Sequence, residues 1–358
     1  MAKKKVLVAP LDWGLGHATR SIPVIQGLVN RGVEVVLASN GRPLALLRKE
    51  FPQLESLEFP PYDVRYPTRS IYWNIATQIP RIAKAAAFEN RIVADLTEKK
   101  GLDAIISDHR LGCYNPQIPS IIVAHQLHLK VAHAVIQYPV RKIHYGLLRQ
   151  FQACWVPDWE NPAHSLAGTL DHPALQSPPT RYIGPLSRLK KVQAPLKYDI
   201  LILLSGPEPQ RTRLERTLLE QAAGLTERIL LVQGKTDAEL PISQNGNLTI
   251  VPYLTSQDLE IALAESRIVV CRSGYSTLMD LAACGKKALL IPTPGQTEQE
   301  YLSDYLWQKR FFLSRQQHQL NLAPDIVNAL EYPGFPENPP GKSLLDSALD
   351  DLLAQIGA

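Results

Sequence analysis

The sequence predicts an α/β protein built from two doubly wound parallel-sheet domains, and three observations lead to this class. Residues 5–10 (KVLVAP) form a short apolar run that a glycine-containing turn and an amphipathic helix follow, as in a βαβ unit. The same order returns at residues 198–224 and at 267–291, where the apolar runs are continuous, as in strands covered on both faces. A chain of 358 residues also exceeds one typical core and suits two domains.

Composition places the chain among globular proteins of ordinary polarity. Apolar residues make up 45% and charged residues 20%, and the net charge is only +4. No nucleic-acid-binding module is visible, so we expect no nucleic-acid partner. The four cysteines form no CxxC pair and no metal-ligand spacing, which favours a reduced, cytoplasmic setting. We expect neither a signal peptide nor a transmembrane helix, because no long apolar stretch is present.

Periodicity and glycine positions predict the remaining elements. In the first half we expect a helix that ends at Gly32, a helix over 72–99 that ends at Gly101, and strands at 103–108 and 120–125. A polar segment at 187–198 reads as a linker. The domains are therefore expected at residues 1–186 and 199–335, with a final amphipathic helix within 336–358.

Residues 267–301 carry the clearest functional pattern. A strand ends at Ser273-Gly274, Ser276 or Thr277 is placed to cap the helix that follows, and Gly285 ends this helix. A helix that begins after a parallel strand offers free N–H groups and a positive dipole end to phosphate. The alternative is an ordinary βαβ unit in which Thr277 and Asp280 form a capping box.

The order of motifs in this stretch resembles the donor site of GT-B glycosyltransferases. The order is CRSG, then a helix with an acidic residue, then AA-x-G-x-x-AL-x-x-P, and then a loop that ends in Q-x-Y. The resemblance is closest to the bacterial enzymes that add N-acetylglucosamine to the lipid-linked peptidoglycan precursor, and it extends to the UDP-glycosyltransferases. It is specific over residues 199–310. It implies two Rossmann-like domains facing across a cleft, an acceptor-side first domain, a nucleotide-sugar-binding second domain and a last helix that crosses back to the first.

The same resemblance implies the reaction. We expect inverting transfer of a hexosyl group, N-acetylglucosaminyl or glucosyl, from a UDP-sugar co-substrate to a hydroxyl acceptor such as a lipid, with no cofactor. A UDP-sugar 2-epimerase shares this architecture and is the enzymatic alternative. A sugar-nucleotide-binding protein without catalytic activity is the other alternative.

The resemblance also implies the donor-site residues. Glycines let backbone approach the phosphates, and Tyr253 stacks on uracil, the alternative being a tyrosine of the core. The two prolines after Gly206 depart from the family pattern and remove N–H donors, so we expect Arg211 to supply charge instead. No convincing D-x-D motif precedes the donor loop, so we expect no metal, with a helix dipole and arginine in its place. The donor-binding residues are Gly14, Gly16, Ser205, Gly206, Arg211, Tyr253, Leu254, Arg272, Ser273, Gly274, Ser276, Thr277, Asp280 (ribose), Gln299 and Glu300 (sugar).

Two residues are the candidate catalytic groups. The turn Gly14-Leu15-Gly16-His17 lacks the dinucleotide fingerprint and resembles the acceptor-side loop of the same glycosyltransferases. There His17 is the expected base, since an imidazole suits proton abstraction near neutral pH; the alternative is a histidine that only caps the helix start. Asp108 ends a strand in the same layer and would orient His17, as in the UDP-glycosyltransferases. Otherwise Asp108 caps the next loop and Asp12 is the rival partner or base.

Charge is unevenly distributed in the first domain. Residues 109–157 contain no Asp or Glu, while five Lys and Arg and five His interleave with apolar residues. This pattern is compatible with contact of residues 126–150 with anionic lipid at the inner face of the membrane, as a peripheral protein. The alternative is a solvated face around a buried helix.

Overall fold

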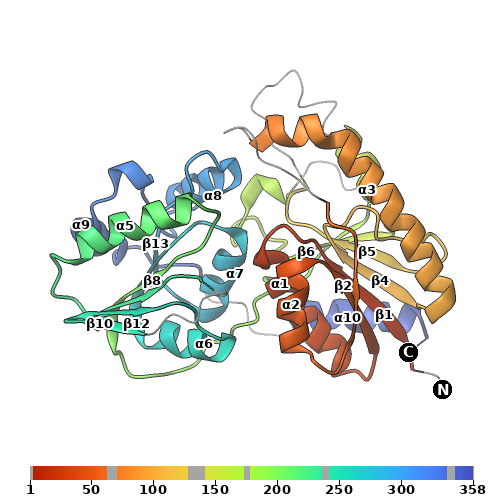
Figure 1. Ribbon diagram of the computed structural model, residues 1–358, viewed down its shortest axis with the longest axis horizontal. Coiled ribbons are helices and arrows are strands. Elements are labelled where there is room, and N and C mark those ends of the chain that lie inside the picture. Colours follow the sequence, from red (N-terminus) through yellow and green to blue (C-terminus); the bar gives the residue numbers. More distant parts are fainter. Residues whose placement is uncertain are drawn as a thin grey trace. The chain divides into compact units, whose positions relative to one another are not determined.

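The chain folds into two units, each with one parallel or mostly parallel sheet between helices (Figure 1). The structure, a computed structural model, describes residues 3–62, 71–127, 142–172, 178–235, 242–336 and 343–357, and only the backbone of 71–80. Unit 1 comprises Met1–Leu186 and Pro340–Ala358, and unit 2 comprises Ser187–Pro339. Unit 2 therefore includes the segment that the sequence suggests as a linker.

Unit 1 contains a seven-stranded sheet in the order β3-β2-β1-β4-β5-β6-β7, and every pair of neighbours is parallel. The strands are β1 (Lys5–Pro10), β2 (Glu34–Ser39), β3 (Glu55–Glu58), β4 (Ala104–Asp108), β5 (Ser120–Val123), β6 (Ala153–Val156) and β7 (Thr180–Tyr182). The long helices described are α1 (Leu15–Val29), α2 (Gly41–Glu50), α3 (Ile71–Lys100) and α10 (Leu344–Gln355).

Strand β1 is where the strand order of this sheet reverses. The chain leaves β1 toward β2 on one side and later returns to place β4 on the other side. The register aligns Pro10 with Asp108, so the loops after β1 and β4 leave the sheet at the same carboxyl edge. Ligands of doubly wound sheets bind at such a reversal, which makes this edge the first place to look for function.

Unit 2 repeats the plan with the strand order β10-β11-β9-β8-β12-β13-β14. Only the β10–β11 pair is antiparallel, and the reversal lies at β8, between β9 and β12. The strands are β8 (Tyr198–Leu203), β9 (Ile229–Val232), β10 (Ser243–Asn245), β11 (Leu248–Val251), β12 (Ser266–Cys271), β13 (Ala288–Leu290) and β14 (Leu313–Ser314). The helices are α5 (Gln210–Ala222), α6 (Ser256–Ala264), α7 (Tyr275–Cys284), α8 (Thr297–Gln308) and α9 (Leu322–Ala329).

Burial explains why the central strands are apolar throughout. Four of the five residues that follow Lys5 in β1 are fully buried or nearly so, and β4 is buried along its whole length. Strands covered by helices on both faces have no solvent side, so apolar residues do not alternate with polar ones along them. The predicted doubly wound class is confirmed.

The last helix belongs to unit 1, where α10 packs against α1 (blue against red in Figure 1). Gly27 makes the close approach feasible, because a Cβ there would lie 2.4 Å from Leu349 Cδ1. Arg31 then bonds to Asp350 at 2.7 Å and to Asp346 at 2.9 Å. Apolar packing and two ion pairs thus hold the chain's end onto its beginning.

A close backbone approach at Gly112 yields a stability prediction. A Cβ on Gly112 would lie 2.1 Å from the carbonyl oxygen of Ala86 in α3, and backbone cannot move aside as a flexible side chain can. Gly112→Ala is expected to lower the unfolding free energy by about 1–3 kcal/mol. Gly146→Ala is the matched control, since no described atom lies within 4 Å of a Cβ there. Urea unfolding measures both, and equal midpoints for the two variants would contradict the prediction.

Candidate functional site

The carboxyl edge of the unit 1 sheet gathers polar residues from three neighbouring strands. The loop after β1 reaches Gly14, whose positive φ of 83° suits the residue just before α1, and His17 lies in the first turn of that helix. Asp108 is the last residue of β4, and His125 follows β5. The strand order thus brings residues that are distant in sequence to one place.

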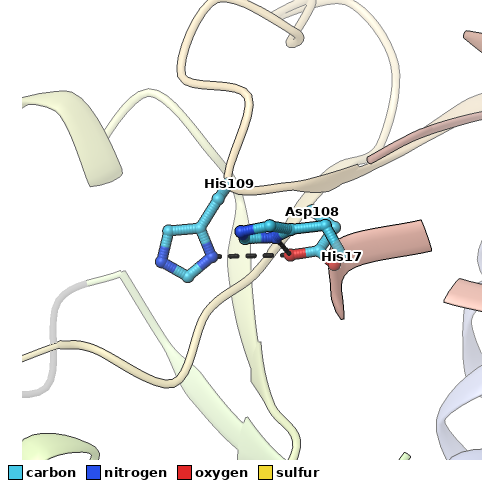
Figure 2. Close-up of side chains that lie close together, drawn as sticks. All are labelled: His17, Asp108 and His109. Carbon is cyan, nitrogen blue, oxygen red and sulfur yellow. Dashed lines mark hydrogen bonds and ion pairs between the residues drawn. The ribbon is translucent and has the colours of Figure 1, made fainter. Parts of the chain in front are cut away.

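His17 and Asp108, the two predicted catalytic residues, lie within hydrogen-bond distance (Figure 2). His17 Nδ1 is 3.1 Å from Asp108 Oδ1, and Asp108 is almost fully buried. Gly14, rather than His17, occupies the helix cap, so the imidazole is not a capping group. The role of the pair in catalysis stays a prediction, but the arrangement that it requires is present.

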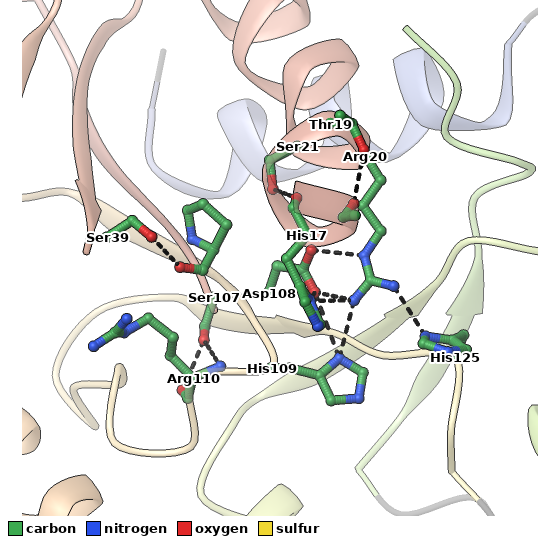
Figure 3. Close-up of polar contacts among 12 residues, drawn as sticks. His17, Thr19, Arg20, Ser21, Ser39, Ser107, Asp108, His109, Arg110 and His125 are labelled. Atoms are coloured by element: carbon green, nitrogen blue, oxygen red, sulfur yellow. Dashed lines mark hydrogen bonds and ion pairs between the residues drawn. The ribbon is translucent and has the colours of Figure 1, made fainter. Parts of the chain in front are cut away.

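Arg20 is the residue that sequence reasoning missed. Its Nε donates to Asp108 Oδ2 at 2.6 Å and its Nη2 donates to Oδ1, which makes a two-pronged buried ion pair. The same guanidinium approaches His17 Nδ1 at 2.8 Å and His125 Nδ1 at 3.0 Å (Figure 3). A signal was available, because Arg20 follows His17 by three residues and therefore shares its helix face.

The electrostatic environment sets the protonation of the pair. Burial, and then the positive charge of Arg20, lowers the pKa of His17 from 6.5 to about 4. Burial acts to raise the pKa of Asp108, but Arg20 and His17 outweigh it and hold that pKa well below its usual range. At neutral pH the site therefore contains a neutral imidazole beside an ionised carboxylate.

The cation in this cluster is a guanidinium. Ligand-type atoms of His17, Asp108 and His109 lie within 4.8 Å of one another. Arg20 Nη2 lies among them, at hydrogen-bond distance from Asp108 Oδ1 and from both imidazole Nδ1 atoms. We therefore assign these three side chains to hydrogen bonding with Arg20.

Asp12, the rival to Asp108, has a different partner. Its Oδ1 lies 3.6 Å from Arg110 Nη1, and Arg110 also pairs with Glu89. The phenol of Tyr62 donates to Glu89 Oε2 at 2.6 Å. Asp12 thus belongs to a second polar cluster under the loop after β1, and it is Asp108 that meets His17.

In unit 2, the predicted donor residues collect at the carboxyl ends of β8 and β12. Ser205 and Gly206 form an exposed loop after β8, and Gly274 precedes α7. The expected cap at Ser276 or Thr277 is wrong, because both residues lie inside α7. The cap position is occupied by Gly274, which has no side chain that could accept a hydrogen bond from the first N–H groups of the helix. The capping box is excluded for the same reason, and the positive end of α7 is left for another acceptor.

Arg272 and Ser273, which lie between β12 and α7, are fully buried and form hydrogen bonds with the residues around the loop after β13. The Nη atoms of Arg272 donate to carbonyl oxygens, among them Pro292 O at 2.9 Å, and to Gln317 Oε1 at 2.8 Å. Burial lowers the pKa of Arg272 to about 10, which leaves it charged at neutral pH. Ser273 Oγ donates to Gln299 O at 2.8 Å. These two residues thus shape the loop and place a positive charge behind it.

Four other predicted donor residues have partners within unit 2. Arg211 pairs with Glu208 and Glu215, so its charge is compensated. Asp280 accepts from Ser187 Oγ at 2.6 Å, and burial raises its pKa to about 6. The side chains of Gln299 and Glu300 accept from backbone N–H groups in the loop after β13, at 2.9 and 2.8 Å. Tyr253 and Leu254 are half-buried in the segment after β11.

Two residues of the loop after β13 were missed by the sequence reasoning. Thr293 Oγ1 and Gln296 Oε1 are buried, and no described residue bonds to either atom. Thr293 Oγ1 would lie 3.6 Å from a Cβ on Gly206, so it adjoins the loop after β8. Buried polar atoms without partners are costly unless a ligand or water satisfies them, which marks this spot as part of a binding site. In the sequence, these two residues are marked only by their place in the loop that follows the apolar run at 288–291.

Comparison with known proteins now identifies unit 2. The model of the glycosyltransferase family 28 C-terminal domain matches residues 210–330. The chain contains a glycosyltransferase family 28 C-terminal domain. The predicted recognition and the predicted class of enzyme, a glycosyltransferase, are confirmed.

Relatives extend the likeness beyond the family 28 domain. The UDP-N-acetylglucosamine–N-acetylmuramyl-(pentapeptide) pyrophosphoryl-undecaprenol N-acetylglucosamine transferase of Methylobacterium nodulans is 25% identical over 84% of this chain and 80% of that protein. The enzyme of the same name from Methylorubrum extorquens is 31% identical over 30% of this chain and 31% of that protein.

Solved structures share the fold over the whole chain. The glycotransferase of kitacinnamycin aligns with a TM-score of 0.66 at 13% identity, over 100% of this chain and 97% of that one. MurG of Acinetobacter baumannii aligns with a TM-score of 0.57 at 16% identity, over 99% and 100%. The GT-B fold class is thereby confirmed. Among the described residues, no helix is both long and apolar enough to cross a bilayer.

The environment of His17 generates a pH prediction. We expect His17 to titrate near pH 4 and to stay neutral at pH 7. Between about pH 6.5 and 4 the unfolded chain binds a proton at this residue that the folded chain does not, so His17 makes the fold less stable as pH falls through this window. Arg20→Met removes the nearby cation while Asp108 remains, and the pKa of His17 should then rise.

Nuclear magnetic resonance titration of the His17 ring protons in both proteins measures this shift. Arg20→Lys is the matched control, because it keeps a positive charge and should raise the pKa less than Arg20→Met does. A His17 pKa that is unchanged in Arg20→Met would contradict the assignment.

Proposed function

We propose that this glycosyltransferase moves a hexosyl group, N-acetylglucosaminyl or glucosyl, from a UDP-sugar to a hydroxyl acceptor with inversion at the anomeric carbon. The observation that carries the proposal is the neutral His17 beside the ionised Asp108, at the strand-order reversal of unit 1. The family 28 domain in unit 2 supports a nucleotide-sugar donor. The names of the relatives support a UDP-sugar and a lipid-linked acceptor.

In the proposed reaction, His17 acts through Nε2. The acceptor oxygen forms a bond to the anomeric carbon, while the bond from that carbon to the diphosphate oxygen breaks and its electron pair leaves with UDP. The acceptor's proton passes to His17 Nε2, and Asp108 stabilises the imidazolium through Nδ1–H. The C–O and N–H bonds that form thus balance the C–O and O–H bonds that break, and the protein returns to its initial state when His17 releases the proton.

For the donor, we propose that unit 2 holds the diphosphate with backbone N–H groups at the start of α7 and in the Ser205-Gly206 loop. The uncapped Gly274 and the buried charge of Arg272 favour an anion here. Thr293 and Gln296 supply further polar contacts, and Tyr253 stacks on the uracil ring. Gln299 and Glu300 contact the sugar once the ligand replaces their present backbone partners.

For the location, we propose a cytoplasmic protein that meets the inner face of the membrane through residues 126–150. The basic and apolar composition of that segment supports this, and so do relatives named for an undecaprenol-linked substrate. Residues 128–141 lie outside the described part of the chain.

Replacing His17 tests the proposed base. His17→Ala should lower UDP release by at least about 100-fold across a panel of UDP-sugars with membrane lipid extract as acceptor source. Binding of UDP should be unchanged, because unit 2 is untouched. His318→Ala, at an exposed position of unit 2, is the matched control and should keep full activity. Retained transfer would remove His17 from the mechanism, and conversion of the UDP-sugar without any acceptor would favour the epimerase.

Metal dependence is tested by chelation. If the helix terminus and Arg272 stabilise the leaving diphosphate, excess EDTA should leave the rate of UDP release unchanged. Added Mg²⁺ or Mn²⁺ should not raise it. Loss of activity in EDTA that Mg²⁺ or Mn²⁺ restores would refute metal-independent transfer.

A further inference from the structure

His109, the residue after Asp108, has the features of a functional residue that nothing so far explains. Its backbone has φ of 61°, a left-handed conformation that is unfavourable for a residue with a Cβ. Its ring centroid lies 5.4 Å from that of His17, nearly edge to face. Its side chain is 18% exposed, whereas that of Asp108 is 3% exposed, so the imidazole can reach a ligand and the carboxylate cannot.

The two histidines compete for the same two partners. Arg20 Nη2 is 2.8 Å from His17 Nδ1 and 3.2 Å from His109 Nδ1. Asp108 Oδ1 is 3.1 Å from His17 Nδ1 and 3.4 Å from His109 Nδ1. Each Nδ1 therefore faces one group that only donates and one group that only accepts.

Counting the protons of Arg20 limits the arrangements. Nε–H and one Nη2–H bind Asp108, and Nη1–H binds His125 Nδ1, so a single Nη2–H remains for the two imidazoles. If both Nδ1 atoms carried protons, this Nη2–H would meet two N–H groups. If neither did, two lone pairs would share one proton and Asp108 Oδ1 would lose a donor. All hydrogen bonds are satisfied when one histidine carries a proton on Nδ1 and donates it to Asp108. The Nδ1 of the other histidine is then unprotonated and accepts from Arg20.

We propose that Arg20 and Asp108 lock His17 and His109 into opposite tautomers, so that the pair always presents one Nε2 lone pair and one Nε2–H to the substrate. In Figure 2 the Nε2 atoms of both rings point away from Asp108 and toward the same side. No described residue bonds to either Nε2. An Nε2 lone pair next to an Nε2–H donor matches two neighbouring oxygens of a ligand. One belongs to a hydroxyl that gives its proton to the lone pair, and the other accepts a hydrogen bond from the N–H.

This assignment deepens the proposed function and rests on it for the identity of the ligand. Of the two satisfied arrangements, the one with His17 protonated at Nδ1 serves the proposed reaction: its Nε2 takes the proton of the attacking hydroxyl, and His109 Nε2–H binds the neighbouring oxygen. The acceptor class that fits is therefore a vicinal diol, as on a saccharide or polyol, rather than an isolated alcohol. His109 becomes an acceptor-binding and specificity-determining residue.

The tautomers are measured in the resting protein, without turnover. Protein labelled with ¹⁵N-histidine gives two-bond ¹⁵N–¹H correlation patterns that distinguish Nδ1–H from Nε2–H at pH 7, and His17→Gln and His109→Gln assign the two signals by their loss. We expect one residue in each tautomer. The same tautomer in both, or a doubly protonated ring in either, overturns the proposal whether or not the protein is a transferase.

Ligand preference is measured with cis-1,2-cyclohexanediol and cyclohexanol, by the shifts that they cause in the ring signals of His17. One added hydrogen bond predicts that the diol binds about three- to tenfold more tightly. His109→Gln keeps an N–H donor near the Nε2 position and should keep the preference. His109→Asn, which suits the left-handed backbone, keeps a polar group near Nδ1 but loses this donor, and should bind both probes equally. Equal binding of both probes by the wild type, or a preference that survives in His109→Asn, contradicts the assignment.

Discussion

The buried ion pair between Asp108 and Arg20 is the interaction on which the unit 1 site depends. Asp108 is 2% exposed and Arg20 is 3% exposed, so both charges have lost their water. Such a pair is tolerated only with well-aligned hydrogen bonds, and removing one partner typically costs about 3–5 kcal/mol because the other charge stays buried. The pair joins α1 to the end of β4, and every histidine of the cluster is oriented by one of its two members.

The two units use the same fold with opposite electrostatics. At the carboxyl edge of unit 1, the cation is neutralised by Asp108, and the partly exposed groups beside this pair are the imidazoles of His17 and His109. At the corresponding edge of unit 2, no carboxylate of the described residues pairs with Arg272, whose partners are carbonyl oxygens. An uncompensated cation behind an uncapped helix terminus creates a positive potential that suits a diphosphate. The difference follows from what occupies the loops, since both sheets reverse their strand order at their first strand, β1 or β8.

Sequence reasoning could place the central strands and the turns that follow them, because apolar runs and glycine turns are local signals. It could therefore bring His17 and Asp108 to one edge of a sheet. It could not assign Arg20, because a buried arginine on a helix reads like any exposed one until its partner strand is placed. Sequence reasoning also missed that Glu208 and Glu215, three and four residues away, pair with Arg211, although the sequence contains this spacing. The unpartnered atoms of Thr293 and Gln296 require packed coordinates to be seen.

The low pKa of His17 constrains how the proposed reaction proceeds. A base with a pKa of about 4 cannot remove a proton from a free hydroxyl, whose own pKa is far higher. Once the acceptor oxygen has begun to bond to the anomeric carbon, its proton becomes strongly acidic, and a weak neutral base then suffices. Proton transfer must therefore follow the onset of carbon–oxygen bond formation, and the donor's departing diphosphate, rather than base strength, drives the step. A histidine kept neutral by burial and by Arg20 is always ready to accept that proton, and Asp108 stays ionised to stabilise the imidazolium that results.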